Sequence, residues 1–142
     1  MDFKVLLKNS CNYKDFCPSC NSHFMNLRPK ITDVIVSNHF LRDLKDETKA
    51  NSLIKDILDC SHSEFNELHK FEENIEGNMI FRAKKDNLHI VYCIDKKMSI
   101  IFLRVIRNFD EYKKFMNEKR EIKSMIDRVQ SSDSLNSSSS SL

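Results

Sequence analysis

The first residues whose types and spacing could support chemistry are cysteines near the start of the chain. Cys17 and Cys20 form a C-x-x-C pair, and Cys11 and His23 lie close enough in the sequence to complete a four-ligand site. Thiolate and imidazole groups at such spacing are common tetrahedral ligands of structural zinc. The pattern predicts a candidate zinc knuckle. Two other interpretations stay open, a redox-active pair and a pair without a special role, since no second C-x-x-C pair follows.

Basic residues, which could bind phosphate, gather in the second half of the chain. The net charge of +2 hides an asymmetry, because residues 1–78 carry 10 Lys and Arg against 13 Asp and Glu, whereas residues 79–142 carry 13 against 8. Guanidinium groups grip phosphate oxygens in pairs and keep their charge at any ordinary pH. The second half is therefore expected to face a polyanion, although a solvated basic face has the same composition.

Length and composition limit the classes of protein that fit this chain. A chain of 142 residues suits a single domain with appendages. No apolar run approaches the roughly 18 residues that a membrane span needs, and the charged start Met1–Lys8 differs from a signal peptide. Five cysteines without an export signal fit a reducing compartment. We therefore expect a cytoplasmic protein with no membrane partner.

The elements that must position any site are predicted to lie in one domain between two appendages. Pro29 closes an N-terminal extension of residues 1–29, because the residue before a proline avoids helical backbone. Residues 30–129 carry the apolar patterns of a folded domain. Residues 130–142 are rich in serine and are expected to be a disordered tail.

The first half of the domain is predicted to contain a strand followed by two helices. The β-branched run Ile31–Val36 predicts the strand, and Ser37 or Asn38 is placed to cap the helix after it. Apolar residues at helical spacing predict a hairpin of two helices that turns around Lys49–Asn51. Ser61–Glu64 has the spacing of a capping box and is expected to open a short amphipathic turn.

The second half is predicted to contain three strands and a helix. Met79–Ala83 and Leu88–Ile94 are expected to pair as a hairpin. Met98–Ile106 is apolar on both faces, which favours a central strand. Asn108 is placed to cap a C-terminal helix that keeps an apolar face to Val129. This order predicts the α+β class, with a helical hairpin packed on one face of a small antiparallel sheet.

This order, together with short motifs, resembles the RelE/ParE superfamily of type II toxin–antitoxin toxins. The resemblance runs from Ile31 to Tyr112 and implies the α+β fold given above. The matching stretches are His69-Lys70-Phe71, Gly77, Arg82, Asn87–Asp95, Ile100–Ile106, Arg107 and Tyr112.

The resemblance also implies an activity. RNA-cleaving members enter the ribosomal A site and cut mRNA there, which inhibits translation. The 2′-hydroxyl attacks the neighbouring phosphate, so the site must take one proton, give another and place cations where negative charge accumulates. This endoribonuclease chemistry requires no cofactor. The expected partners are the ribosome, mRNA and a cognate antitoxin protein.

The resemblance assigns roles to individual residues. Arg82 is the cation on a strand, Arg107 the cation at the end of the last strand, and Tyr112 the aromatic side chain that stacks on a base or assists proton transfer. Three further basic residues are expected to bind the RNA backbone: Lys84, Lys85 and Arg104.

His89 departs from the family pattern, which frequently has an arginine before the "ivY" motif. Imidazole can act as a general acid or base near neutral pH but is a poorer permanent cation. With His89 in place of the arginine, the site is expected either to stabilise the phosphate less well or to use a different chemistry. The turn before it has Asn87 in place of the family's glycine, which the fold tolerates because asparagine also accepts a positive φ.

Each candidate residue also has a structural interpretation. Arg82 and Arg107 fit solvated strand residues, His89 fits a partly buried structural histidine, and Tyr112 fits the apolar face of its helix. The same fold also admits a ParE-like inhibitor of DNA gyrase, or a degenerate domain that binds RNA or protein without cutting. A third possibility outside the superfamily is an interaction module whose C-terminal helix pairs with another protein.

Overall fold

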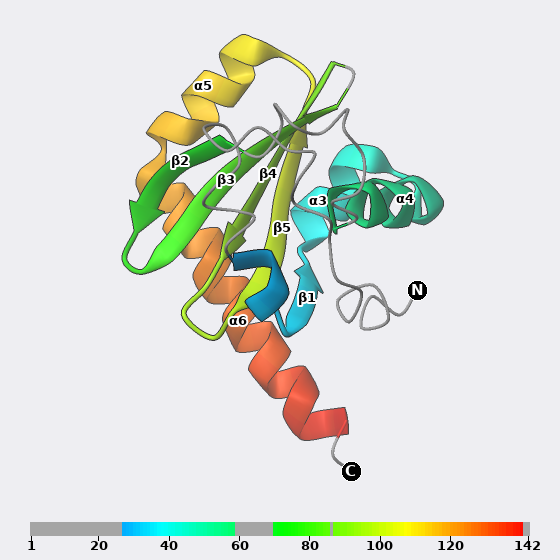
Figure 1. Cartoon of the computed structure of the whole chain (residues 1–142), viewed down its shortest axis with the longest axis vertical. Coiled ribbons are helices and arrows are strands. Elements are labelled where there is room, and N and C mark those ends of the chain that lie inside the picture. Colours follow the sequence, from blue (N-terminus) through cyan, green and yellow to red (C-terminus); the bar gives the residue numbers. More distant parts are fainter. Residues whose placement is uncertain (1–26, 59–69, 86, 141–142) are drawn as a thin grey trace.

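The computed structural model describes residues 27–58, 70–85 and 87–140, which form a five-stranded mixed sheet and its helices (Figure 1). The strand order is β1-β5-β4-β3-β2. The strands are β1 (Asp33–Val36), β2 (Lys70–Ile75), β3 (Asn78–Lys85), β4 (Leu88–Ile94) and β5 (Ser99–Ile106). The helices are η2 (Arg28–Lys30), α3 (Asn38–Leu44), α4 (Glu47–Leu58), α5 (Phe109–Asn117) and α6 (Lys119–Ser140). These elements confirm the predicted α+β class.

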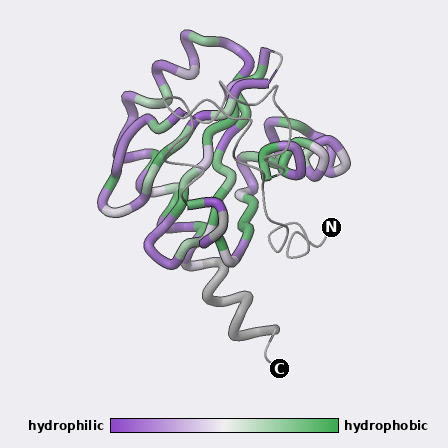
Figure 2. Tube along the Cα trace, viewed as in Figure 1, coloured by the Kyte–Doolittle hydropathy of each residue, from purple (hydrophilic) through white to green (hydrophobic). Residues whose placement is uncertain are grey.

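The centre of the sheet is apolar, as the sequence predicts. Figure 2 shows the hydrophobic residues concentrated along the middle strands, whereas α5 and the β2–β3 turn are mostly hydrophilic. β5 lies between β1 and β4, and β3 pairs with β4 as an antiparallel hairpin. The hairpin and the central position of β5 are therefore confirmed. Within the described ranges, no helix has both the length and the apolar character needed to cross a membrane.

The sheet is mixed, so the prediction of an antiparallel sheet is wrong for one pair of strands. β1 pairs with β5 in parallel, and Val34 lies opposite Ile100. Parallel neighbours need a long crossover connection, and here the chain between β1 and β5 includes two helices and three strands. A strand's own residues show its periodicity but do not determine its partner or its direction.

Helices cover both faces of the sheet, whereas the sequence predicted one covered face. Ile80 and Phe81 are neighbours on β3 and point to opposite faces, as strand geometry requires. Phe81 belongs to a buried cluster with Ile54 of α4. Ile80 belongs to a second buried cluster with Tyr112 of α5 and Ile126 of α6. We call this second side the α5 face of the sheet.

β2 is a strand that the sequence did not predict. Ser61–Glu64, where a capping box was expected, lies outside the described residues. Lys70–Ile75 pairs along the outer side of β3, with an irregularity between Phe71 and Glu73. Its glutamates have low strand propensity, and the backbone hydrogen bonds of β3 stabilise the strand instead. An edge strand with charged side chains also resists further pairing.

The turn between β2 and β3 depends on a glycine. Glu76 and Gly77 both have positive φ angles, 50° and 90°. This conformation matches the two-residue hairpin turn that twists with its strands. The Asn74 side chain stabilises the turn by accepting a hydrogen bond of 2.9 Å from the Gly77 N–H.

We predict that Gly77→Ala lowers the free energy of unfolding by at least about 1 kcal/mol, because alanine is strained at positive φ. Chemical denaturation would measure the change. Ser52→Ala, at an exposed position of α4, is the control and should change stability by under about 0.5 kcal/mol. An equal effect of both substitutions would contradict the prediction.

The first two helices meet at Lys45 and Asp46, so the predicted turn around Lys49–Asn51 is wrong. Lys45 adopts a left-handed conformation with φ 58° after α3 ends. Asp46 then accepts a hydrogen bond of 2.9 Å from the Thr48 N–H at the start of α4. Glycine or asparagine usually marks such a helix end, and neither is present at position 45.

The predicted C-terminal helix is two helices. Asn108 caps α5 as predicted, since its side chain accepts hydrogen bonds from the N–H groups of Asp110 (2.8 Å) and Glu111 (3.2 Å). The helix is interrupted at Glu118, and α6 then crosses the sheet and extends beyond it (Figure 1). α6 continues to Ser140, through most of the segment for which the composition predicts disorder.

Candidate active site

Three of the predicted site residues converge on the α5 face of the sheet. Arg82 comes from β3, His89 from β4 and Tyr112 from α5. The His89 and Tyr112 rings stack with centroids 5.1 Å apart and an interplanar angle of 19°. The Arg82 guanidinium carbon lies 5.1 Å from the centre of the Tyr112 ring. The fold therefore brings a permanent cation, an imidazole and a phenol into one cluster.

Each member of this cluster has a buried polar atom without a hydrogen-bond partner. The atoms are Arg82 Nε, His89 Nδ1 and Tyr112 Oη, and they are the only such side-chain atoms in the part of the chain that the structure describes. Glu72 of β2 forms an ion pair with Arg82, but its Oε1 lies 3.7 Å from Nε, too far for a hydrogen bond. Buried polar groups are normally satisfied. Three unsatisfied groups in one place point to a site that binds a ligand.

The charges around His89 favour its neutral form. Burial lowers the pKa of His89 below its ordinary value, and the nearby cations Arg82 and Lys84 lower it further. Lys84 lies directly across from His89 in the β3–β4 pairing. At neutral pH the imidazole is therefore unprotonated and can accept a proton. The neutral imidazole carries no positive charge of its own to offer a phosphate.

Tyr112 is held in its protonated form. Burial raises the pKa of its hydroxyl, the Glu72 carboxylate raises it further, and Arg82 opposes the shift only in part. A phenol with a raised pKa is a weak proton donor at neutral pH. Stacking and positioning therefore suit Tyr112 better than proton transfer.

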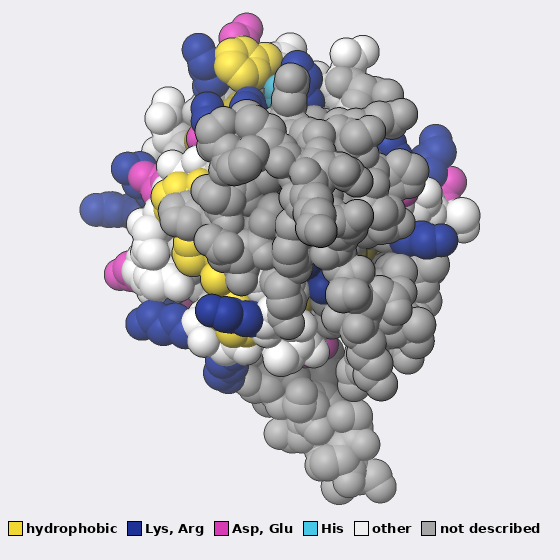
Figure 3. All heavy atoms as spheres, in the orientation of Figure 1, with side chains coloured by type: hydrophobic (Ala, Val, Ile, Leu, Met, Phe, Trp, Pro, Cys, Tyr) yellow, Lys and Arg dark blue, Asp and Glu magenta, His cyan; other side chains and the backbone are white. Residues whose placement is uncertain are grey.

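A hollow of about 350 Å³ lies beside Arg82 and Tyr112. Its other lining residues include Phe109 and Lys113 of α5. Phe109 is 47% exposed, and the Lys113 ammonium lies 4.9 Å from the centre of its ring. In the space-filling view, Lys and Arg side chains surround exposed apolar atoms at the top of the molecule, where α5 begins (Figure 3). An exposed aromatic ring among cations is a typical platform for a nucleic-acid base.

The sequence did not identify Glu72, Phe109 or Lys113 as members of this cluster. Glu72 belongs to the unpredicted strand β2, so its position beside Arg82 could not be inferred. Phe109 directly follows the predicted helix cap Asn108, and an aromatic residue at an exposed helix start was a usable signal. Lys113 is one of two adjacent lysines, and only the packing of α5 distinguishes it from its neighbour.

Two of the predicted basic residues lie apart from this cluster. Lys85 is on the opposite side of β3 from Arg82 and Lys84 and forms an ion pair with Asp56 of α4. Arg107 is exposed and follows Ile106, which lies across from His89. Arg107 is therefore at the same end of the sheet as His89, and none of the described residues forms an ion pair with it.

Arg104 has a structural partner. Asp43 of α3 accepts hydrogen bonds from Arg104 Nε (2.7 Å), Arg104 Nη2 (3.2 Å) and the Val105 N–H (2.8 Å). The guanidinium also lies over the Phe115 ring, with its carbon 5.5 Å from the ring centre. These contacts connect α3, β5 and α5. They occupy the Arg104 guanidinium, which the sequence analysis expected to bind the RNA backbone.

We predict that Asp43→Asn lowers the free energy of unfolding by about 2 kcal/mol, because it weakens three charge-assisted or backbone hydrogen bonds at a half-buried position. Thermal and chemical denaturation would test this. Asp127→Asn removes an exposed ion pair with Lys123 and should cost under about 0.5 kcal/mol. Equal stabilities of the two variants would show that the Arg104–Asp43 contact contributes little.

The described residues contain no group of three or more His, Cys, Asp or Glu side chains that could hold a metal ion. The candidate zinc ligands Cys11, Cys17, Cys20 and His23 lie outside the described residues. The cluster around His89 offers a proton acceptor, cations and aromatic rings.

Comparisons with models of known families, with curated proteins and with solved structures find no match to this chain.

Proposed function

We propose that this protein is a RelE-like toxin, an endoribonuclease that inhibits translation by cutting mRNA at the ribosome. The observation that carries the proposal is the convergence of Arg82, His89 and Tyr112, each with a buried polar atom that has no hydrogen-bond partner. A phosphodiester with a neighbouring 2′-hydroxyl would supply partners for these groups: anionic oxygens for Arg82 and a transferable proton for His89.

The proposed reaction begins when neutral His89 accepts the proton of the RNA 2′-hydroxyl. The 2′ oxygen forms a bond to phosphorus while the bond to the 5′ oxygen of the next nucleotide breaks. The products are a 2′,3′-cyclic phosphate and a 5′-hydroxyl, whose proton comes from water because Tyr112 is a weak acid. Arg82 and Lys84 stabilise the negative charge that develops on the phosphate.

The aromatic residues position the RNA in this proposal. Phe109 is exposed beside the hollow and offers a face on which a base can stack. The Tyr112 ring stacks on His89 and holds the imidazole in place.

The experiment that tests the proposal uses translating ribosomes and a defined mRNA. The wild type should produce fragments with 2′,3′-cyclic phosphate and 5′-hydroxyl ends, and an Arg82→Ala, Arg107→Ala double variant should not. Replacing the 2′-hydroxyl at the cleavage site by hydrogen should block the reaction, because the attacking oxygen is then missing. Growth arrest after induction would be measured in parallel.

Other outcomes would assign a different function. Growth arrest by the wild type without mRNA cleavage would contradict the nuclease proposal and favour a gyrase inhibitor or a protein-binding module. Cleavage that is unchanged in the double variant would place the active site elsewhere. Absence of both arrest and cleavage would favour a degenerate domain of the same fold.

A further inference from the structure

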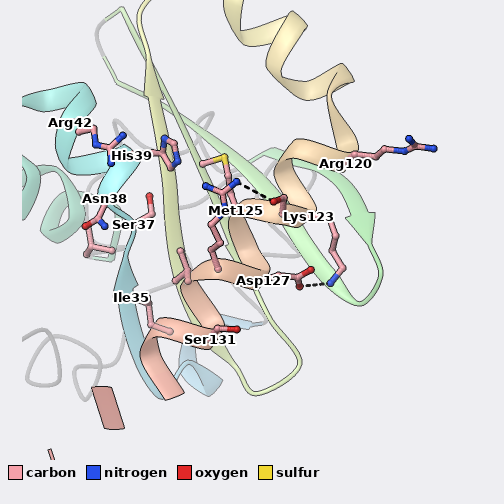
Figure 4. A pocket seen from close by; sticks show the side chains of 14 residues that line it. Ile35, Ser37, Asn38, His39, Arg42, Arg120, Lys123, Met125, Asp127 and Ser131 are labelled. Atoms are coloured by element: carbon pink, nitrogen blue, oxygen red, sulfur yellow. Dashed lines mark hydrogen bonds and ion pairs between the residues drawn. The ribbon is translucent and has the colours of Figure 1, made fainter. Parts of the chain in front are cut away.

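A second and larger hollow lies on the α5 face as well, at the β1 edge of the sheet, between β1 and α6. Its volume is about 820 Å³. One wall comes from the end of β1 and the start of α3, including Ile35 and His39, and the other wall comes from α6 (Figure 4). Four cationic side chains line it, and we call it the basic groove: Arg42, Arg120, Lys123 and Arg128.

Three of these cations are available to a ligand. Lys123 forms ion pairs with Glu76 and Asp127. Arg42, Arg120 and Arg128 are exposed, and no ion pair joins any of them to a described residue. Asp127 is the only acidic residue among the described lining residues. Several like charges around one hollow repel each other, and an anionic ligand would relieve this repulsion.

The cations are spread along the groove rather than focused on one point. Arg120 and Arg128 are eight residues apart, so they lie about 12 Å apart along α6. Arg42 faces α6 from α3, whereas the Arg120 side chain points away from α3 (Figure 4). The cations therefore form a row across the molecule. A row of this kind suits a linear polyanion better than a single compact anion.

The row leads toward the candidate active site. Asn117, at the end of α5, lines the hollow beside Arg82, and Arg120, in the first turn of α6, lines the basic groove. Only the junction between α5 and α6 separates these two residues in the chain. The hollow is itself lined by the cations Lys70, Arg82 and Lys113. Cations thus line both hollows, on either side of this junction.

We infer that the basic groove binds the phosphate backbone of single-stranded RNA that leads into the candidate active site. The identity of the polyanion rests on the proposed function, whereas the groove and its charges do not. An acidic protein segment would also be attracted to the groove. Nucleic acid is favoured because one strand would match the cations of both hollows with a charge at every nucleotide.

The test measures binding of a fluorescent 12-nucleotide RNA whose 2′-hydroxyls are methylated, so that it cannot be cut. The groove variant is Arg42→Gln, Arg120→Gln, Arg128→Gln. The control variant, Lys49→Gln, Lys55→Gln, Lys97→Gln, removes the same charge from exposed positions outside the groove. Circular dichroism and thermal unfolding confirm that both variants are folded.

The groove variant is expected to bind about tenfold more weakly than the wild type at 0.1 M salt, and the control less than about twofold more weakly. The slope of log K against log salt should become shallower by about 2, since each phosphate contact on a single strand contributes about 0.7. Equal affinity of the groove and control variants would overturn the inference. So would a poly-glutamate peptide of equal charge that binds the groove more tightly than the RNA.

The same proteins separate this inference from the proposed function. If the wild type binds the methylated RNA through the groove but does not cut unmodified mRNA, the inference stands and the nuclease proposal fails. If the wild type cuts mRNA and the groove variant cuts limiting concentrations of it equally fast, the nuclease proposal stands and the inference fails.

Discussion

Replacing His89 with phenylalanine is expected to abolish RNA cleavage and to leave the protein at least as stable as the wild type. A general base typically accelerates its reaction by about 10²- to 10⁴-fold, and phenylalanine cannot accept a proton. The substituted ring can keep its contacts with Tyr112 and Phe109, which now stack or tilt against the imidazole. It also removes the unpaired Nδ1, whose burial costs about 1 kcal/mol or more.

Single-turnover cleavage at saturating enzyme and chemical denaturation would measure the two effects. His39→Phe is the control for the chemical step alone. His39 lines the basic groove, so its substitution is expected to affect RNA binding, but at saturating enzyme it should leave the rate of cleavage unchanged. A His89→Phe protein that still cuts RNA would remove His89 from the mechanism. A protein that cuts no RNA but is also much less stable would favour a structural histidine.

The stability difference between His89→Phe and the wild type should grow as the pH falls. In the folded wild type the pKa of His89 is lowered, whereas in the unfolded chain it is close to its ordinary value of 6.5. Below pH 6.5 the unfolded state therefore binds a proton before the folded state does, which destabilises the fold. The loss is complete once the pH is below the folded pKa, and phenylalanine avoids it.

Replacing Arg82 with glutamine is expected to slow cleavage by about 10²- to 10³-fold. The guanidinium is placed to stabilise the charge that develops on the phosphate, and removing one such donor has an effect of this size in other enzymes. Arg82 also lowers the pKa of His89. Without this cation the pKa of His89 rises toward its ordinary value, and the acidic limb of the pH–rate profile moves to higher pH.

The pH dependence of the cleavage rate and an NMR titration of His89 would measure both consequences. Lys85→Gln is the matched control: it removes the same charge from the same strand, on the face away from His89. It should leave both the rate and the pKa of His89 nearly unchanged. Equal losses in the two variants would mean that general charge, rather than the position of Arg82, supports the reaction.

Local sequence patterns were enough to predict several of the elements. Strand patterns predicted β1, the β3–β4 hairpin and the central strand β5. These patterns, alternating polarity and β-branched residues, depend only on residues within a few positions of one another. Asn108 was identified as a helix cap and Ser37 as one of two candidates, since a cap requires only a suitable side chain and the free N–H groups that follow it. The sequence also placed His89 on the same side of β4 as other residues of the α5 face.

Contacts between residues distant in the chain set where these elements meet and which charged residues share a site. The unpredicted strand β2 brings Glu72 to Arg82, and the packing of α5 brings Tyr112 onto His89. At the irregularity in β5, Val91 lies opposite Arg104 and the next pair along β4 skips Leu103. Such a bulge interrupts the alternation of side chains between the two faces of the sheet. The alternating pattern in the sequence therefore cannot show on which face Arg104 lies.

The same limit applies to the cations of the basic groove. Arg42 and Arg128 are far apart in the sequence, on helices that each look like an ordinary amphipathic surface. They line one hollow only because β1 pairs in parallel with β5 and α6 crosses the α5 face toward β1. Pairing direction and helix packing depend on contacts between residues distant in the chain. Local sequence patterns do not contain that information, and the folded structure supplies it.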